Sequence, residues 1–283
     1  PLSNVGTLTN QGIELEVGYK LSVDKVNLSF LMNASYVKNE IKNLGNQTGY
    51  IDKESLPTLG TVSRNENGYP IGYFFGYKAI GVFQTQEEID SYISPATGKP
   101  IQPNAAPGDT KFEDLNGDGV ISDDNEDRTM IGKPNPDWMV GLTVAADWNG
   151  FDLSAFFQGS FGADVFDALR RYELAAVNYT SDALERWTGP GTSNSMPRIV
   201  LGDTPKNFRP STLLVHDASF LRLRNLQVGY TLPAQLTRKA YIQRLRFYAS
   251  FDNLLTITGY KGMDPEIGST MGIDKGVYPQ ARV

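Results

Sequence analysis

The 283-residue sequence contains no cysteine and only one histidine. The missing cysteine excludes disulfide bonds, thiol catalysis and cysteine-based metal sites. A Ser-His-Asp triad needs a histidine as its base, so it could be built only with this single histidine. No run of 18 apolar residues is present, and this excludes a transmembrane helix.

The sequence also lacks an excess of positive charge. Its net charge is −6 and no basic cluster appears, so we expect no nucleic-acid partner. Neither an initiator methionine nor a signal peptide precedes Pro1. We therefore expect the chain to be a piece, or a processed product, of something longer.

What the sequence does contain is a composition typical of many strands and turns, with 11% aromatic residues, 28 glycines and 16 prolines. Its clearest pattern is an alternation of apolar and polar residues, which predicts β-strands with two unlike faces. The alternation leaves open which face residues Leu221 to Arg224 belong to. The alternating segments are residues 13–22, 26–36, 137–148, 151–161, 220–232 and 245–252.

The length of these segments indicates a membrane. They run for ten to twelve residues, whereas globular strands average about five or six and a strand crossing a bilayer needs about 9–11. The ten residues from Trp138 to Trp148 span roughly 33 Å at about 3.3 Å each. A tilt of about 40° projects this to roughly 25 Å, the height of the apolar band of a membrane barrel. Trp138 at one end, and Trp148 with Phe151 at the other, occupy girdle positions.

The connections between the segments alternate in length. Short turns occur at Val23 to Lys25, at Asn149-Gly150 and over about ten residues after Pro233, while long segments separate the pairs. This is the pattern of a bacterial outer-membrane barrel with periplasmic turns and extracellular loops. To keep the short turns on one side, the apolar stretch Ile71 to Phe83 must lie within a loop. The same parity leads us to expect a further strand after Val283.

The predicted fold is therefore all-β: a partial antiparallel transmembrane β-barrel of about six crossing strands, with long extracellular loops carrying short helices. Thr85 with Glu88 forms a capping-box pattern and predicts a helix over Thr85 to Ile93. A second short helix is predicted over Ser181 to Trp187. The expected units are barrel hairpins at 1–37, 137–162 and 220–254, extracellular loops at 38–136 and 163–219, and an extracellular segment at 255–283.

Several stretches resemble one known family in order along almost the whole chain. The most specific is Asp114 to Ile121 followed by Asp127-Arg128 and Gly132 to Pro136. The others are Ser3 to Leu15, Gly72 to Tyr77, Pro107 to Asp109, Asp152 to Gly159, Ser219 to Leu226, Gly229 to Pro233, Asp252 to Thr256 and Tyr260 to Glu266. Together they resemble the C-terminal part of the SusC/RagA family of TonB-linked outer-membrane proteins.

The resemblance implies a location in the outer membrane of a Gram-negative bacterium, and no enzymatic activity. It implies the import of a sizeable nutrient, an oligosaccharide or a peptide. It also implies a SusD-like lipoprotein that caps the barrel, and energy from TonB through parts of the protein outside this chain. The alternative reading is a soluble cell-surface β-sandwich that binds glycans. In a sandwich the apolar faces would pack on each other instead of on lipid.

An acidic loop is a candidate calcium site. Asp114, Asn116 and Asp118 stand at positions one, three and five of an EF-hand-like loop, and Gly119 permits the sharp turn. Asn125 replaces the usual glutamate at position twelve. Ca²⁺ fits because all donors are hard oxygens. The other reading is a tight turn whose Asx side chains bond their own backbone. The candidate ligands are Asp114, Asn116, Asp118, the Val120 carbonyl, Asp123 and Asp127.

Other candidate residues carry weaker signals. The loop aromatics Tyr172, Tyr179 and Trp187 could stack on sugar rings or face the lipoprotein, or they could pack within their loop. His216 lies between Val215 and Asp217, which do not resemble a catalytic setting, so we interpret it as an ordinary loop or lumen histidine. Polar residues of the strands should face the barrel lumen; they are Asp152, Ser154, Gln158, Arg244, Arg246 and Asp252.

Overall fold

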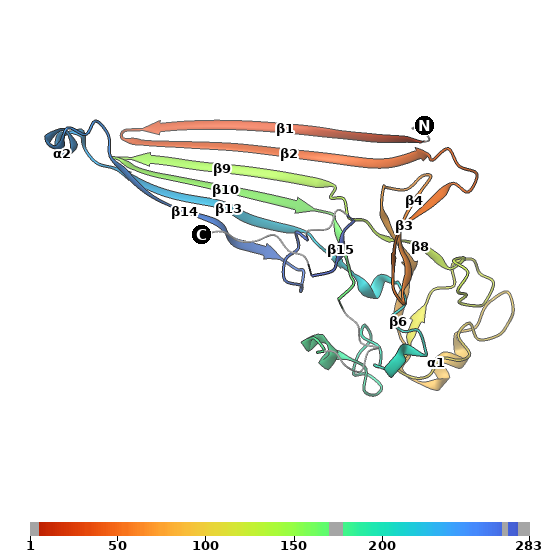
Figure 1. Cartoon of the computed structure of the whole chain (residues 1–283). Coiled ribbons are helices and arrows are strands. Elements are labelled where there is room, and N and C mark those ends of the chain that lie inside the picture. Colours follow the sequence, from red (N-terminus) through yellow and green to blue (C-terminus); the bar gives the residue numbers. More distant parts are fainter. Residues whose placement is uncertain (1–5, 170–177, 268–270, 277–283) are drawn as a thin grey trace.

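The computed structural model describes residues 6–169, 178–267 and 271–276. Six long strands form one antiparallel sheet in the order β1-β2-β9-β10-β13-β14, which we call the barrel sheet (Figure 1). Within the described residues β1 and β14 each pair with one strand only, so the sheet is an open part of a barrel wall, as predicted. Its strands are β1 (Thr7–Val23), β2 (Val26–Asn43), β9 (Trp138–Trp148), β10 (Phe151–Phe161), β13 (Phe220–Thr231) and β14 (Arg246–Thr258).

The strand register collects the apolar residues on one face. Phe151 pairs with Trp148 on one side and with Tyr230 on the other, and Tyr230 pairs with Phe247. The rings of Trp148 and Phe151 are stacked with centroids 6.4 Å apart. This apolar face is uncovered: Ile13, for example, is 73% exposed. A sandwich would bury such a face, so the exposed face contradicts the β-sandwich alternative.

Three short connections lie at the same end of the barrel sheet, on the left of Figure 1, which we call the turn end. Asn149 and Gly150 join β9 to β10 with φ of 48° and 86°, the left-handed values that a tight hairpin turn requires. Asp24 has φ 51° in the turn between β1 and β2. The connection from β13 to β14 contains the helix α2 (Ala234–Thr237) and the 3₁₀ helix η4 (Arg238–Ala240).

The first two strands run further than predicted. β1 has 17 residues and β2 has 18, whereas the alternation covers only 13–22 and 26–36. Their extra residues pair with each other, from Thr7 opposite Asn43 to Gly12 opposite Val37. Backbone hydrogen bonds continue there although the side chains no longer alternate, because pairing does not depend on apolar side chains. Residues 38–43, expected in a loop, are therefore strand.

The opposite end of the barrel sheet carries the loop-end region, built from smaller sheets and short helices. Among the described residues, no helix has the length and apolar character to cross a bilayer. The strands are β3 (Tyr50–Leu56), β4 (Gly60–Glu66), β5 (Tyr73–Tyr77), β6 (Ala79–Val82), β7 (Thr110–Phe112), β8 (Arg128–Gly132), β11 (Asp164–Asp167), β12 (Val215–Asp217) and β15 (Ile273–Asp274). The helices are α1 (Gln86–Ser91) and the 3₁₀ helices η1 (Ser181–Glu185), η2 (Leu201–Asp203) and η3 (Thr212–Leu214).

The loop-end region bears out two local predictions. The stretch 71–83 forms β5 and β6, which belong to small sheets and not to the barrel sheet. The helix α1 begins at the predicted capping box: Thr85 Oγ1 accepts a hydrogen bond from the Glu88 amide, and Glu88 Oε2 accepts one from the Gln84 amide. The second predicted helix is the 3₁₀ turn η1.

One hydrophobic core joins segments of the loop-end region that are far apart in the sequence. Val62, Phe74, Phe166, Leu214 and Ile273 come from β4, β5, β11, η3 and β15, and all are buried. The rings of Phe74 and Phe166 lie 5.8 Å apart. This core joins β4, β5, β11, η3 and β15 at the mouth of the barrel wall.

Candidate functional site

The polar face of the barrel sheet carries charged side chains that pair across strands. Arg246 on β14 binds Asp152 on β10 through two hydrogen bonds of 2.5 and 3.0 Å. The pair crosses β13 over Gly229, where an added Cβ would lie about 2.6 Å from the Asp152 carboxylate. Glycine at this position lets the ion pair lie close to the backbone of β13. Asp152 and Arg246 thus share the face predicted for them.

A β-bulge turns two arginines toward the same face nearer the loop end. Phe156 of β10 pairs with Asn225 of β13, and the next residue, Phe157, pairs with Leu223. Arg224 lies between them without a partner position on β10, so it is the extra residue of the bulge. An extra residue shifts the alternation by one position, so the residues of one face are odd-numbered before the bulge and even-numbered after it. The bulge thereby resolves the ambiguity at residues 221–224.

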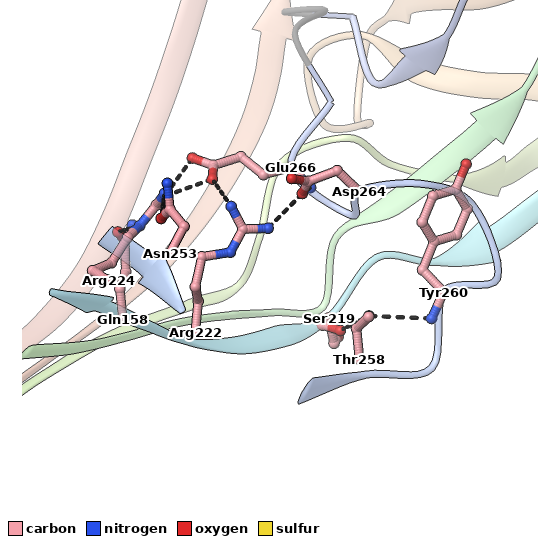
Figure 2. Close-up of polar contacts among 9 residues, drawn as sticks. All are labelled: Gln158, Ser219, Arg222, Arg224, Asn253, Thr258, Tyr260, Asp264 and Glu266. Carbon is pink, nitrogen blue, oxygen red and sulfur yellow. Dashed lines mark hydrogen bonds and ion pairs between the residues drawn. The ribbon is translucent and has the colours of Figure 1, made fainter. Parts of the chain in front are cut away.

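Arg224 is held by partners from three directions (Figure 2). Its Nε donates to Gln158 Oε1 of β10 at 2.7 Å, and its Nη1 donates to Asn253 Oδ1 of β14 at 3.0 Å. Its Nη2 donates to Glu266 Oε2 at 2.5 Å. Asn253 itself has φ 53°, where β14 also departs from regular pairing.

Arg222 completes an ion network with the segment that follows β14. Its side chain is 3% exposed, its Nη2 donates to Asp264 Oδ1 at 2.5 Å, and its Nη1 donates to Glu266 Oε2 at 3.1 Å. Glu266 thus bridges Arg222 and Arg224, and two cations face two carboxylates. A buried cation needs such partners, because its loss of hydration is otherwise uncompensated.

The network fixes a return segment, residues 259–267, against the inside of the wall (Figure 2). Thr258 Oγ1 donates to the Ser219 carbonyl at 2.8 Å and accepts from the Tyr260 amide at 3.1 Å. Tyr260 is buried and donates its hydroxyl to Asp274 Oδ2 at 2.6 Å. The segment therefore lines the polar side of the wall at the loop end.

The acidic loop is closed by its own backbone. Asp114 accepts hydrogen bonds from the amides of Gly117 and Gly119, both at 2.8 Å, and Asp118 Oδ1 accepts from the Val120 amide. The two oxygens of buried Asp127 accept from the amides of Leu115 and Ser122, while Asn116 Oδ1 accepts from the Asp118 amide.

These contacts are the Asx turns of the alternative reading. Asp123 points away from the loop to the Lys206 ammonium, whose hydrogen bond lowers the pKa of this carboxyl. Over the residues that the structure describes, no group of three or more histidine or acidic side chains is arranged to hold a metal ion. Calcium binding here stays a prediction. Calorimetry with Ca²⁺ on the parent, Asp114→Ala and Asp118→Ala tests it, and identical heats would refute it.

The loop aromatics have different surroundings. Trp187 packs against the other long loop, residues 38–136: its ring covers Gly108, where an added Cβ would lie 2.4 Å from the ring, and its Nε1 donates to Gln84 Oε1. Tyr179 is 46% exposed. Tyr172 lies outside the described residues. Substrate contact by these three residues stays a prediction.

His216 lies in β12 and pairs with Val165 of β11. Its Nε2 is 3.8 Å from Asp167 Oδ2, and its ring centroid is 6.1 Å from that of Tyr260. The position is in a small sheet of the loop-end region, as a loop histidine would be.

Sequence similarity to TonB-dependent receptors decides the family. No family profile matches the chain. The chain is 31% identical over 99% of its length to TonB-dependent receptor P3 of Formosa agariphila, and 30% identical over 98% of its length to TonB-dependent receptor SusC of Bacteroides thetaiotaomicron. The chain belongs to the SusC/RagA family of TonB-dependent outer-membrane proteins. It spans 28% and 26% of the length of these two relatives.

Solved structures of the SusC/RagA family agree with the fold. The RagAB peptide transporter superposes on 98% of this chain with a TM-score of 0.74 at 26% identity, and 28% of the transporter chain is covered. The 'open-open' state of the RagAB peptide importer gives a TM-score of 0.72. The protein is therefore an outer-membrane β-barrel protein, and the exposed apolar face of the barrel sheet is its lipid-facing surface.

The ion network was missed in the sequence although its residues lie in stretches that carry the SusC/RagA resemblance. A signal was present. The apolar residues of β13 are odd-numbered at Leu221 and Leu223 and even-numbered from Leu226 onward. Such a change of parity requires one extra residue in the strand, and Arg224 stands at that position.

Proposed function

We propose that this chain forms part of the wall of a TonB-energised importer that carries oligomeric nutrients, glycans or peptides, across the outer membrane. The observation that carries the proposal is the barrel sheet itself, whose alternating segments are apolar on the outer face and carry charged and other polar side chains on the inner face. The outer face suits lipid. The inner face suits a hydrated passage, because polar solutes lose little hydration beside charged and amide side chains.

The return segment adds to the proposal. It narrows the passage at the loop end, where Arg222 and Arg224 fix it, and a cavity of about 190 Å³ between segment and wall is lined by Gln158, Ser160 and Glu266 among others. A fixed inner contour of this kind suits a passage that must admit oligomers of limited width.

The partners follow from the same proposal. A SusD-like lipoprotein would cover the mouth formed by the loop-end region, and TonB would act through parts of the protein outside this chain. The related RagAB structures support a gated importer, since they record 'open-open' and 'closed-closed' states. The Asp-rich loop and the aromatics Tyr179 and Trp187 lie in this region.

Uptake by cells tests the proposal. Cells producing the full-length protein would be incubated with labelled oligosaccharides and labelled oligopeptides, with and without a protonophore that removes the energy for TonB. We expect accumulation of one class, lost on deletion of the gene and lost with the protonophore. Unchanged accumulation of every probe after deletion would contradict the proposal.

A further inference from the structure

A ladder of alternating arginine and aromatic side chains runs through the loop-end region. Its members are, in spatial order, Tyr50, Arg64, Phe75, Arg128, Tyr77, Arg209 and Phe112. The Arg128 guanidinium carbon lies 4.3 Å from the centre of the Phe75 ring, and that of Arg209 lies 4.7 Å from the Tyr77 ring. Each ring holds a guanidinium on its face, which is a favourable arrangement for a cation.

The cations of this ladder differ in their carboxylate partners. Arg64 binds Asp52 at 2.8 Å. Among the described residues, Arg128 has no carboxylate within 4.0 Å; it donates to the carbonyls of Thr61 and Phe75 and to Asn125 Oδ1. All three acceptors are neutral. No carboxylate of the described residues therefore forms an ion pair with Arg128.

The positive charge of Arg209 also has only a distant carboxylate partner. Its Nη1 is 3.9 Å from Asp123 Oδ1, and the other oxygen of that carboxylate binds the Lys206 ammonium. Arg128 Nε and Arg209 Nη1 are buried nitrogen atoms that find no hydrogen-bond acceptor among the residues that the structure describes. Burial lowers the pKa of Arg128. Partly desolvated cations with unfilled donors are costly unless an anion completes them.

A cavity of about 570 Å³ adjoins these cations. It is lined by Arg128, Lys206, Arg209, Tyr77 and the turn at Thr58 to Gly60. The two carboxylates in its lining already have partners: Asp123 has Lys206, and Asp203 accepts from the amides of Asn207 and Phe208. Lys206 and Arg209 also line a second cavity of about 690 Å³. The cavity is thus an open space with cations on its wall and its own carboxylates engaged.

We infer that this cavity binds a carboxylate group of the imported oligomer. Arg209 and Lys206 line the cavity and provide the donors, Lys206 when it exchanges its bond to Asp123 for a bond to the ligand. Arg128, whose Nη atoms are bonded to neutral acceptors of the chain, adds positive charge beside them. The inference rests on the proposed import function and makes it more specific: the carried oligomer is acidic. A uronic acid residue and an acidic amino acid present the same carboxylate chemistry.

Equilibrium binding to the full-length protein in detergent tests the inference. The probes are trigalacturonate against trigalactose, and the N-acetylated, C-amidated peptide Gly-Glu-Gly-Glu against its Gly-Gln-Gly-Gln counterpart. We expect the acidic member of one pair to bind about tenfold more tightly, since a charge-assisted hydrogen bond is worth about that factor. The preference should weaken at high salt because screening reduces charge attraction.

Variants assign the preference to the cavity. Arg209→Gln should remove it, and Arg209→Lys should keep part of it. Asp123→Asn should strengthen it several-fold, because it removes the carboxylate that competes for Lys206. Asp123 is 66% exposed in its side chain, so this variant should fold normally. The control is Arg238→Gln at the turn end, an exposed cation that should leave the binding of all probes unchanged.

The outcomes separate this inference from the importer proposal. Equal affinity for acidic and neutral probes would overturn the carboxylate site, as would a preference that survives Arg209→Gln and does not respond to Asp123→Asn. Energised uptake of neutral oligomers would in that case leave the importer proposal standing. Preference in the sugar pair or in the peptide pair would identify which acidic oligomer is carried.

Discussion

Phe74 in the loop-end region is fully buried, whereas Ile13 in the barrel sheet is 73% exposed. Both are large apolar residues in β-strands. The first is stabilised by a core of residues from five distant segments, and the second lies on a face that only lipid can cover. The comparison shows that large apolar residues of this chain serve two environments: the protein core of the loop-end region and the lipid around the barrel sheet. Replacing a large apolar side chain by a small one should therefore lower the stability strongly at the loop end and only slightly on the lipid face.

Phe74→Ala is expected to give the largest effect. It removes a ring from the closed core that contains Phe166, and such a deletion costs about 3–5 kcal/mol. The matched variant Ile13→Ala should cost far less, because detergent or lipid fills the space. Hydrogen exchange measures both, read at the loop-end amides for Phe74→Ala and at the β1 and β2 amides for Ile13→Ala. Equal protection in the two variants would mean that the two regions do not differ as described.

Arg222→Ala comes next, because it leaves Asp264 and Glu266 without their buried partner. Loss of one partner of a buried ion pair costs about 3–5 kcal/mol. Exchange should rise over the return segment and not over β1 and β2. Arg224→Ala should give a smaller loss, since Glu266 is more than a third exposed and solvent screens that pair. An undisturbed return segment in Arg222→Ala would contradict the role given to the network.

Gly229→Ala tests the polar face of the barrel sheet. An added methyl group meets the ends of the Asp152 and Arg246 side chains, which must move, so we expect a small loss of stability. Gly18→Ala is the control, because an added Cβ there meets only one side-chain atom, 3.7 Å away. Denaturant unfolding of the detergent-solubilised protein compares the two. If both variants match the parent, the pair does not cross β13 as closely as described.

A smaller effect is expected from the pH dependence of Asp164 in β11. Burial raises the pKa of this carboxyl, the hydrogen bond from the Lys133 amide opposes the rise, and nearby Asp217 adds to it. The folded state therefore binds the proton more tightly than the unfolded state, whose pKa is about 3.9. Stability falls as pH rises from that value through the raised pKa.

Asp164→Asn removes this titration. The stability of the variant relative to the parent should increase over the same pH window and then stay constant up to neutral pH. Hydrogen exchange of the β11 amides at a series of pH values measures the difference. A difference that does not change with pH would contradict the raised pKa.

The barrel sheet could be predicted because its information is local. Alternation locates all six strands, and Asn149-Gly150 locates a turn, since each depends on residues that are neighbours in sequence. The extensions of β1 and β2 could not be predicted in this way, because backbone pairing continues where side chains such as Thr9 and Lys38 no longer alternate.

The loop-end region could be predicted only in its local parts. The Thr85 capping box locates α1, but nothing near Val62 indicates that it meets Ile273 across more than two hundred residues. The candidate site divides in the same way. The polar face at Asp152 follows from alternation, whereas the partners of Arg222 arrive from a segment that carries no periodic signal.

The most direct test of the account uses the absence of cysteine from this chain, which makes each introduced thiol a unique reporter within it. Single cysteine variants along β9, from position 142 to 147, would be tested in membranes in two ways: by reaction with a water-soluble thiol reagent, and by labelling with a thiol-reactive fluorophore followed by a lipid-dissolved quencher of its fluorescence. The account predicts a period of two: positions 143, 145 and 147 react with the water-soluble reagent, and positions 142, 144 and 146 are quenched from the lipid. Reaction without alternation, or with the two sets exchanged, would contradict it.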